Sequence, residues 1–380
     1  MNQYKIGKVD IILFRAPIDT PVRTSFGTMF ERTALLIRLE DVSGGHGWGE
    51  VWCNFPTCGA EHRANLIETV FAPLLIGAAF TRPEDGQRFL KDKTRILGIQ
   101  TAEFGPLAQV AAGFDIAFHD LAARRAGLPL HRFLGGQGDG SMPVYASGIN
   151  PDGAADTVLF SREAGYRAFK LKVGFGMEQD LANLDRIGQG LEPGERLMVD
   201  ANQAWDLGRA RDMSIRLGRY DLDWLEEPIM ADRPAEEWAE LAAASPFPLA
   251  AGENIRGRAE FSQLIGLGSI GVIQPDACKW GGVSACLDVA RAALEAGRRY
   301  CPHYLGGGIG LIASAHILAA AGGDGLLEVD VNSNPLRENL AQPIPAIKAG
   351  QLILSDAPGL GVEPDLAGTS RYIVSRREIR

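Results

Sequence analysis

Three short apolar runs in the middle of the chain each end in a carboxylate: Val199-Asp200-Ala201-Asn202-Gln203, Trp224-Leu225-Glu226-Glu227-Pro228 and Ala251-Gly252-Glu253-Asn254. The carboxylates at 200, 226 and 253 are 26 and 27 residues apart. This interval accommodates one strand, one helix and two loops, as in an α/β barrel, whose strands all end at one face. Three carboxylates brought to one face by successive strands suit a hard cation such as Mg²⁺. Spacing alone does not separate Glu226 from Glu227, because only one of two adjacent side chains can face inward.

The same alternation of short strand, loop and helix runs through residues 137–349. Eight such units in about 200 residues favour a closed barrel. The alternative is an open doubly wound sheet, which would need a phosphate-binding glycine turn near its first strand. The predicted strands are 144–147, 168–173, 197–200, 223–226, 249–252, 272–275, 299–302 and 326–329, and the predicted helices include 177–191, 234–244, 283–296 and 311–321.

Residues 1–136 show a different pattern, with strands first and helices after them. Alternating apolar and polar residues at 4–14 and 33–52 predict an antiparallel meander of about three strands. Helical periodicity follows, and we therefore expect a separate α+β unit with a glycine-rich exit linker at 134–140. Strand-like segments at 351–355 and 372–375 suggest that residues 350–380 return to this unit. The predicted helices of the unit are 62–76, 83–96 and 106–126.

The bulk properties are those of a soluble globular protein, with 46% apolar and 22% charged residues. A formal net charge of −9 argues against nucleic acid as a partner, since nucleic acid is usually bound by a basic patch. The N-terminus lacks the apolar segment of a signal peptide, and the longest apolar stretch, 309–322, is too short to cross a bilayer. The five cysteines are odd in number and scattered, which indicates free buried thiols. We expect a cytoplasmic protein with no membrane partner.

The later predicted strands all end close to an ionisable residue. Singly, such residues are often helix caps, solvated lysines or core histidines, but chance does not place one at seven consecutive strand ends. Together they indicate an active site at the carboxyl ends of the strands. Lys170 shares a face with the first of them, because side chains alternate along a strand. The series is Lys172, Asp200, Glu226, Glu253, Asp276, His303 and Glu328.

The segment Gly266-Leu267-Gly268-Ser269-Ile270-Gly271 matches the glycine pattern of dinucleotide-binding proteins. That motif requires a strand before it and a helix after it. Here the predicted order is the reverse, so we interpret the segment as an ordinary loop.

With these residues in place, the chain resembles the enolase superfamily, and within it the mandelate racemase subgroup, along essentially its whole length. The resemblance implies an N-terminal capping domain (1–136), a modified (β/α)₇β TIM barrel (137–349) and a C-terminal segment (350–380) that rejoins the cap. It also implies a Mg²⁺ cofactor held by Asp200, Glu253 and Glu226, the first glutamate of Glu-Glu-Pro.

The resemblance further assigns catalytic roles. Lys172, the second lysine of Lys-x-Lys, is implied as a base, and Asp276 and His303 as an acid/base dyad. Glu328 is implied as a hydrogen-bond donor to the substrate carboxylate. The muconate-lactonizing branch is similar but has a lysine where this chain has Asp276, and Lys279 matches the non-catalytic lysine of that motif.

The chemistry shared by such enzymes removes a proton next to a carboxylate and gives an enediolate. Lys172 must be neutral to act as a base, so we expect Lys170 and the cation to lower its pKa. Asp276 would accept the ring N–H of His303 and set its tautomer. Glu328 can donate only when protonated, which predicts a raised pKa in an apolar setting.

Substrate contacts are expected from two loops of the cap, 20–29 and 52–58, and from the rim of the barrel. Their mixture of polar and aromatic residues suits either a sugar acid or a smaller cyclic acid. The candidate substrate-binding residues are Asn202, Arg23, Trp52, Tyr145 and Lys279.

We therefore expect a Mg²⁺-dependent lyase that dehydrates a sugar acid or another small hydroxy acid. A racemase or epimerase would use the same residues without a leaving group. A barrel that binds a ligand without catalysis is a third hypothesis. The substrate is expected to be a small carboxylate, and the resemblance implies a homo-oligomer, either a dimer or an octamer.

Overall fold

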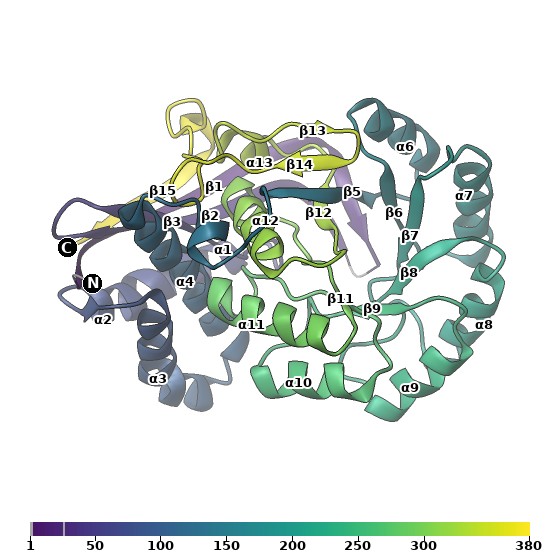
Figure 1. The fold of residues 1–380 in the computed structure, drawn as a ribbon, viewed down its shortest axis with the longest axis horizontal. Helices are drawn as coiled ribbons and strands as arrows, with labels where there is room; N and C mark the ends of the chain where they lie inside the picture. Colours follow the sequence, from purple (N-terminus) through teal and green to yellow (C-terminus); the bar gives the residue numbers. More distant parts are fainter. Residues whose placement is uncertain (1–2, 26) are drawn as a thin grey trace.

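The computed structural model describes residues 3–25 and 27–380, and Met1, Asn2 and Phe26 lie outside the described residues. These residues form an N-terminal unit around an antiparallel sheet and a second unit around a parallel sheet (Figure 1). None of the described helices combines the length and the apolar character that crossing a membrane requires.

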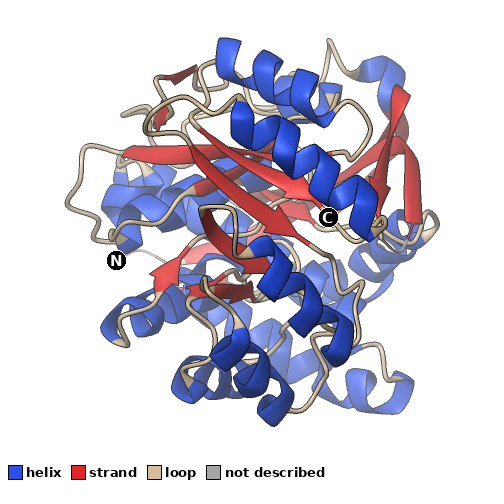
Figure 2. Cartoon of the chain, turned by 90° about the vertical axis from the view of Figure 1, so that its right-hand side faces the viewer, coloured by secondary structure: helices blue, strands red, loops and turns tan. Residues whose placement is uncertain are grey.

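The second unit contains, within the described residues, eight parallel strands that pair in the order β12-β5-β6-β7-β8-β9-β10-β11. Seven helices of the described chain connect them, and these lie outside the strands (Figure 2). An α/β chain with parallel strands is therefore confirmed. The strands are β5 (Ser141–Ile149), β6 (Ala168–Lys172), β7 (Arg196–Asp200), β8 (Leu222–Glu226), β9 (Leu249–Ala251), β10 (Val272–Ile273), β11 (Arg299–Tyr300) and β12 (Leu327–Asp330).

The connecting helices follow the predicted positions closely, and differ from them mainly at their ends. The helix predicted at 311–321, for example, begins one turn earlier in the structure. The helices are α6 (Ala154–Glu163), α7 (Met177–Gln189), α8 (Leu207–Leu217), α9 (Ala235–Ala244), α10 (Arg258–Leu267), α11 (Gly282–Glu295) and α12 (Gly308–Ala321).

One apolar side chain from each parallel strand, or from the residue beside it, belongs to a single buried cluster. This cluster is separate from the core between the strands and the helices. Because side chains alternate along a strand, the cluster marks the inner face of the sheet. Its members are Tyr145, Ala168, Met198, Trp224, Ala250, Val272, Cys301 and Leu326.

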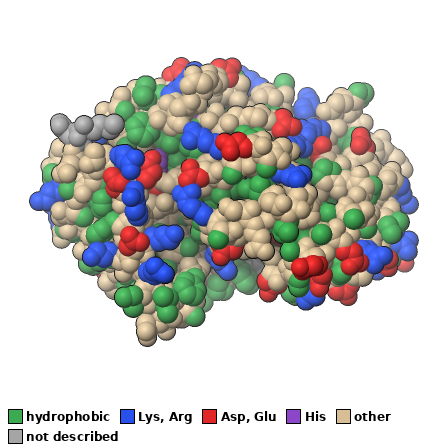
Figure 3. All heavy atoms as spheres, turned by 60° about the horizontal axis from the view of Figure 1, so that its bottom comes forward, with side chains coloured by type: hydrophobic (Ala, Val, Ile, Leu, Met, Phe, Trp, Pro, Cys, Tyr) green, Lys and Arg blue, Asp and Glu red, His purple; other side chains and the backbone are tan. Residues whose placement is uncertain are grey.

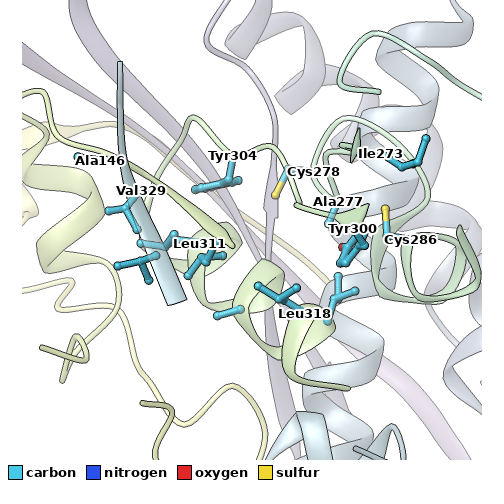
Figure 4. Close-up of a cluster of buried hydrophobic side chains, with 14 of the residues drawn as sticks. Ala146, Ile273, Ala277, Cys278, Cys286, Tyr300, Tyr304, Leu311, Leu318 and Val329 are labelled. Atoms are coloured by element: carbon cyan, nitrogen blue, oxygen red, sulfur yellow. The ribbon is translucent and has the colours of Figure 1, made fainter. Parts of the chain in front are cut away.

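The outer face of the same strands packs against the surrounding helices. Ala146 and Val329 project from neighbouring strands, and Leu311 and Leu318 come from α12 (Figure 4). This alternation, with one set of residues inside the sheet and the other under the helices, explains why the strands read as near-continuous apolar runs.

The N-terminal unit contains the predicted meander, with β1 (Tyr4–Thr24), β2 (Gly27–Asp41) and β3 (His46–Val51) paired antiparallel. β1 is longer than predicted and continues into the stretch expected to be a loop. The helix predicted at 62–76 is built from α1 (Gly59–Leu66), a π-helical turn (Ile67–Phe71) and α2 (Ala72–Leu75). The remaining elements are β4 (Ala79–Phe80), α3 (Pro83–Thr101), α4 (Phe104–Ala126) and α5 (Leu130–Phe133).

The C-terminal residues contact both units. β15 (Ile373–Ile379) pairs antiparallel with β1 of the N-terminal unit. In contrast, β14 (Gln351–Ile353), expected to return to that unit, pairs with β5 and with β13 (Ile347–Lys348) beside the parallel sheet. The tail thus crosses from one sheet to the other, and the short elements α13 (Pro335–Asn339) and a 3₁₀ turn (Ser370–Tyr372) lie along its course.

All five cysteines are free, but only four of these described residues are buried, because Cys58 is exposed. The expectation that every thiol is buried is therefore wrong for Cys58, which lies immediately before α1.

β3 lies very close to α4, and two glycines make this approach possible. A side-chain carbon on Gly49 would overlap the backbone carbonyl of Gly113, and one on Gly47 would overlap the carbonyl of Ala117. The absence of side chains lets the strand and the helix pack backbone to backbone.

Two buried carboxylates of the N-terminal unit lie at the starts of helices in the second unit. Glu50 of β3 accepts hydrogen bonds from the backbone N–H groups of Gly307 (2.6 Å) and Gly310 (2.9 Å) at the start of α12. Asp115 of α4 accepts hydrogen bonds from the N–H (2.8 Å) and the hydroxyl (2.7 Å) of Ser284 in the first turn of α11. Unpaired N–H groups and the helix dipole both favour a negative charge at such positions.

We predict that Gly49→Ala destabilises the protein by about 2–3 kcal/mol, because the added methyl group forces β3 and α4 apart. The matched control is Gly266→Ala in α10, where a side-chain carbon has open space, so stability should stay equal or rise by up to about 1 kcal/mol. Urea unfolding measures both, and equal stabilities for the two variants would contradict the close approach.

We predict that Glu50 contributes to the pH dependence of stability. Burial raises its pKa to about 7, although the N–H groups of Gly310 and Gly307 favour the charged form. Because this pKa exceeds the unfolded value of about 4.3, Glu50 destabilises the fold as the pH rises from about 4.3 to 7, by at most about 1.4 kcal/mol per pH unit. Glu50→Gln should flatten the pH dependence between pH 5 and 7.

Urea unfolding at several pH values measures this slope, with Glu338→Gln as a control because that glutamate is exposed. A slope in Glu50→Gln that equals the wild-type slope would contradict the assignment.

Candidate active site

Polar side chains lie directly above the apolar cluster inside the parallel sheet. In seven strands of the described sheet, the residue two positions after the cluster member is polar and faces the same side. β9 differs, because Gly252 occupies that position with a φ of 152°, and Glu253 follows it. This inner layer lies at the carboxyl ends of the strands, and its members are Ser147, Lys170, Asp200, Glu226, Gln274, His303 and Glu328.

Lys170 lies at the centre of this layer and is fully buried. Its ammonium group is 2.7 Å from Glu226 of β8, 2.7 Å from Glu328 of β12 and 3.9 Å from Asp200 of β7. Burial lowers the pKa of Lys170, but Glu226 and Glu328 outweigh it and hold the pKa well above its ordinary value. Lys170 therefore carries a positive charge that joins three strands.

Lys172 contacts the first candidate metal ligand. Its ammonium group donates to Asp200 (2.5 Å) and to the side-chain oxygen of Asn202 (2.7 Å). The sequence predicted a lowered pKa for Lys172, but in this arrangement the pKa is raised. Burial does lower the pKa of Lys172, but the Asp200 carboxylate outweighs burial and Lys170, so the net shift is upward. In this arrangement Lys172 is protonated.

Glu226 and Glu227 are both buried, but they face different partners. Glu226 accepts hydrogen bonds from the Trp224 indole (3.2 Å), which places it on the inner face of β8. Glu227 has a φ of 37°, so the strand has ended there, and its carboxylate accepts from the Asn254 amide (2.8 Å). The inner position thus belongs to Glu226, as the resemblance implies.

Glu253 is surrounded by cations. Lys279 donates to it (2.9 Å) and to the side-chain oxygen of Asn254 (3.0 Å), and His303 Nε2 is 3.2 Å away. Burial raises the pKa of Glu253, but His303 and Lys279 together lower it far below its ordinary value. The Lys279 ammonium also lies over the ring of Trp52, 4.9 Å from its centroid, so Trp52 covers this side of the site.

Asp276 and His303 form a hydrogen-bonded pair. Nδ1 of His303 is 2.8 Å from Asp276, whose other oxygen accepts the backbone N–H groups of Cys278 (2.8 Å) and Lys279 (3.0 Å). Burial lowers the pKa of His303, but Glu253, Glu328 and Asp276 raise it to a net value of about 9. The ring is therefore an imidazolium, with Nδ1–H held by Asp276.

Glu328 differs from its expected state. It accepts hydrogen bonds from Lys170, from the hydroxyl of Ser147 and from the backbone N–H of Tyr304 (2.9 Å). Burial raises the pKa of Glu328, but Lys170 and His303 outweigh it and bring the pKa to about 2. The predicted raised pKa is therefore wrong for this arrangement, in which Glu328 is a carboxylate that accepts hydrogen bonds.

The carboxylates Asp200, Glu226 and Glu253 supply the oxygen ligands that Mg²⁺ prefers. Each is buried or nearly so, and each is paired with a lysine: Lys172, Lys170 and Lys279 respectively. Among the described residues, no group of three or more His, Cys, Asp or Glu side chains lies close enough together to hold a metal ion as arranged here. The donor set nevertheless fits a divalent cation, because its donors are carboxylate oxygens. Their negative charge already binds three lysine ammonium groups.

Of the predicted substrate-binding residues, Arg23 lies away from this cluster and Tyr145 lies beneath it. Arg23 is exposed, pairs with Asp152 (2.6 Å) and lies over the ring of Phe175. Tyr145 is fully buried below Lys170, whose ammonium group is 5.3 Å from the ring centroid.

The loop that carries Arg23 does reach the site through another residue. Ser25 donates a hydrogen bond to the backbone carbonyl of Asn202 (2.6 Å). Sequence reasoning missed Gln274, whose amide donates to Glu226 (2.7 Å). Gln274 lies two residues after Val272, which is the spacing of the polar residues on the other strands, and this spacing could have predicted its position.

Comparisons with known proteins show the family of this chain. The model of the mandelate racemase / muconate lactonizing enzyme N-terminal domain matches residues 8–135, and that of the enolase C-terminal domain-like family matches residues 154–368. The D-galactarolactone cycloisomerase of Agrobacterium fabrum is 30% identical over 94% of this chain and 96% of its own. The L-talarate/galactarate dehydratase of Salmonella typhimurium is 34% identical over 94% of this chain and 88% of its own.

Solved structures of related proteins have the same fold along nearly the whole chain. A mandelate racemase/muconate lactonizing enzyme from Bordetella bronchiseptica superposes with a TM-score of 0.91 at 54% identity, covering 98% of this chain and 100% of the other. A racemase from Streptomyces coelicolor with bound magnesium has a TM-score of 0.87 at 27% identity, covering 97% of this chain and 100% of the other. The chain therefore belongs to the enolase superfamily, in its mandelate racemase/muconate lactonizing enzyme family.

Proposed function

We propose that this protein is a Mg²⁺-dependent enzyme that removes the proton next to the carboxylate of a small hydroxy acid. The observation that carries the proposal is the arrangement of three carboxylates on neighbouring strands with Lys172 on one side and the Asp276–His303 pair on the other. Relatives in the same family are dehydratases, cycloisomerases and racemases, which supports this common first step.

The fold proposed for this chemistry is a modified (β/α)₇β barrel. The inner row of apolar residues, one from each strand, supports closure, and so does the hydrogen bond from the backbone of Tyr304, after β11, to Glu328 of β12. We propose residues 1–136 as the cap, 137–349 as the barrel and 350–380 as a segment returning to the cap.

Asp200, Glu226 and Glu253 would hold the cation. Mg²⁺ bound there would act as a Lewis acid toward the substrate carboxylate as it gains negative charge. Lys279 and Asn254 keep Glu253 in position, as Gln274 does for Glu226.

The acid/base steps fall to two side chains. Lys172 or His303 would remove the proton, and they come from strands that are not neighbours in the sheet. Both are protonated in the present arrangement, so the one that acts as the base must first lose its own proton, which a cation at Asp200 and Glu253 would favour. Asp276 holds the His303 ring so that Nε2 faces the carboxylates. In a dehydration, His303 would pass a proton to the departing hydroxyl group.

We propose dehydration of a sugar acid as the overall reaction, supported by the galactarate dehydratase relative. A racemase or epimerase is the second candidate, supported by two acid/base groups that approach from different strands and by the racemase relatives. We also propose that the enzyme works in the cytoplasm. It would form a homo-oligomer, either a dimer or an octamer, and light scattering would measure the mass of this assembly.

We predict that one or more acids in a panel of hydroxy and sugar acids will react in D₂O with Mg²⁺, followed by NMR. A 2-keto product identifies dehydration, and deuterium next to the carboxylate without that product identifies epimerisation. A panel that includes sugar lactones also tests cycloisomerisation. The reaction should stop after treatment with EDTA and resume with added Mg²⁺. No exchange on any acid, together with no Mg²⁺ affinity in calorimetry, would favour a non-catalytic barrel.

With a reacting acid in hand, we predict that Lys172→Ala and His303→Asn each lower kcat by about a thousandfold or more, because each removes an acid/base group. The matched controls are Lys348→Ala, at an exposed position, and His62→Asn, at a surface pair with Glu103. Rates close to wild type in both active-site variants would refute the proposed roles.

A further inference from the structure

A second cavity lies between the N-terminal domain and the helices around the parallel sheet. Its volume is about 780 Å³, within the range of about 300–1,000 Å³ typical of small-molecule sites. Residues of α3 and α4 line one side, and residues of α10 and α11 line the other. None of its lining residues belongs to the carboxylate–lysine cluster, so it is a separate site.

The lining of this cavity is strongly basic, although the whole protein carries a net charge of −9. Figure 3 turns the side of the molecule with α3 and α10 toward the viewer and shows basic side chains, with acidic ones among them, on its left-hand part. The basic lining residues are Arg82, Arg88, Lys91, Arg125, Arg258 and Arg291.

Two carboxylates, Glu84 and Asp288, also line the cavity, and together with nearby carboxylates they neutralise these charges only in part. Asp85 pairs with both Arg82 (3.3 Å) and Arg88 (3.1 Å), so one carboxylate serves two arginines. Asp288 pairs with Arg258, and Asp41 pairs with Arg125 (2.9 Å).

Two basic residues of the lining have no carboxylate partner. In the described part of the chain, Arg291 donates only to the backbone carbonyl of Leu134 (3.1 Å), and Lys91 has no ion pair. The cavity therefore has an excess of positive charge on both of its walls, since Lys91 lies on α3 and Arg291 on α11.

A buried histidine adds a further polar group. His119 is only 1% exposed and lines the cavity, with Nδ1 hydrogen-bonded to the backbone carbonyl of Asp115 (2.8 Å). Its Nε2 is 3.9 Å from the nearest recorded carboxylate oxygen, that of Glu84, which is too long for a hydrogen bond. His119 therefore adds a ring nitrogen to the lining of the cavity, near the carboxylate of Glu84.

We propose that this cavity binds a small organic anion with at least two carboxylate or phosphate groups. Guanidinium groups match both kinds of anion through paired hydrogen bonds. The volume exceeds what one inorganic ion needs, and the basic residues are spread over both walls, which favours a ligand with several charges. Such a ligand would contact the N-terminal domain and the helices of the catalytic domain at once, and would stabilise their present arrangement.

Calorimetry of the full-length protein without Mg²⁺ tests the proposal, with citrate and inorganic pyrophosphate as the probes at constant ionic strength. We expect at least one probe to bind, and the stronger one identifies carboxylate or phosphate as the preferred group. In Arg88→Gln/Arg291→Gln the affinity should fall at least tenfold. The active-site variant Lys172→Ala should bind as the wild type does, which separates this site from the proposed catalytic one.

The matched control is Lys93→Gln/Lys348→Gln, which removes the same charge at exposed positions outside the cavity. Circular dichroism confirms that each variant is folded. The proposal is overturned if neither probe binds at millimolar concentration, if the control weakens binding as much as the cavity variant, or if Lys172→Ala abolishes it.

Discussion

The arrangement of the parallel sheet depends on the buried charge of Lys170. An ammonium group without exposure to water is costly unless carboxylates surround it, and Glu226 and Glu328 do so from two other strands. These contacts form only if β6, β8 and β12 end at the same level. The same requirement places Asp200, between β6 and β8 in the sheet, within 4 Å of Lys170. A misplaced strand would leave a buried charge unpaired. The polar layer therefore favours one strand register, and that register in turn brings the polar residues together.

Much of this layer could be predicted from the sequence because it obeys a simple spacing. A buried residue such as Trp224 or Leu326 is followed two positions later by a polar one, and alternation along a strand then gives its direction. Glu253 escapes this rule, because the positive φ of Gly252 redirects the chain after β9. Its place at the rim was found from the interval between strands instead.

Contacts between distant segments could not be predicted in this way. Arg23 was a predicted substrate-binding residue, but the long hairpin of β1 and β2 carries it to Asp152. The protonation states also depend on such contacts. Burial alone would have made Glu328 neutral, and only the distance to Lys170 and His303 shows that their charges prevail. A residue pattern gives the direction of a side chain, whereas its charge state depends on neighbours from several strands.

The carboxylates Glu50 and Asp115 make the second unit depend on the N-terminal domain. Each belongs to the N-terminal domain, yet each binds the first turn of a helix that follows a strand of the parallel sheet, α12 after His303 and α11 after Asp276. If the second unit were excised, these helix ends would be exposed without their acceptors. The two domains are therefore not interchangeable modules. A replacement of the N-terminal domain would have to preserve these two acidic positions, or the segments that carry Asp276 and His303 would lose their contacts with it.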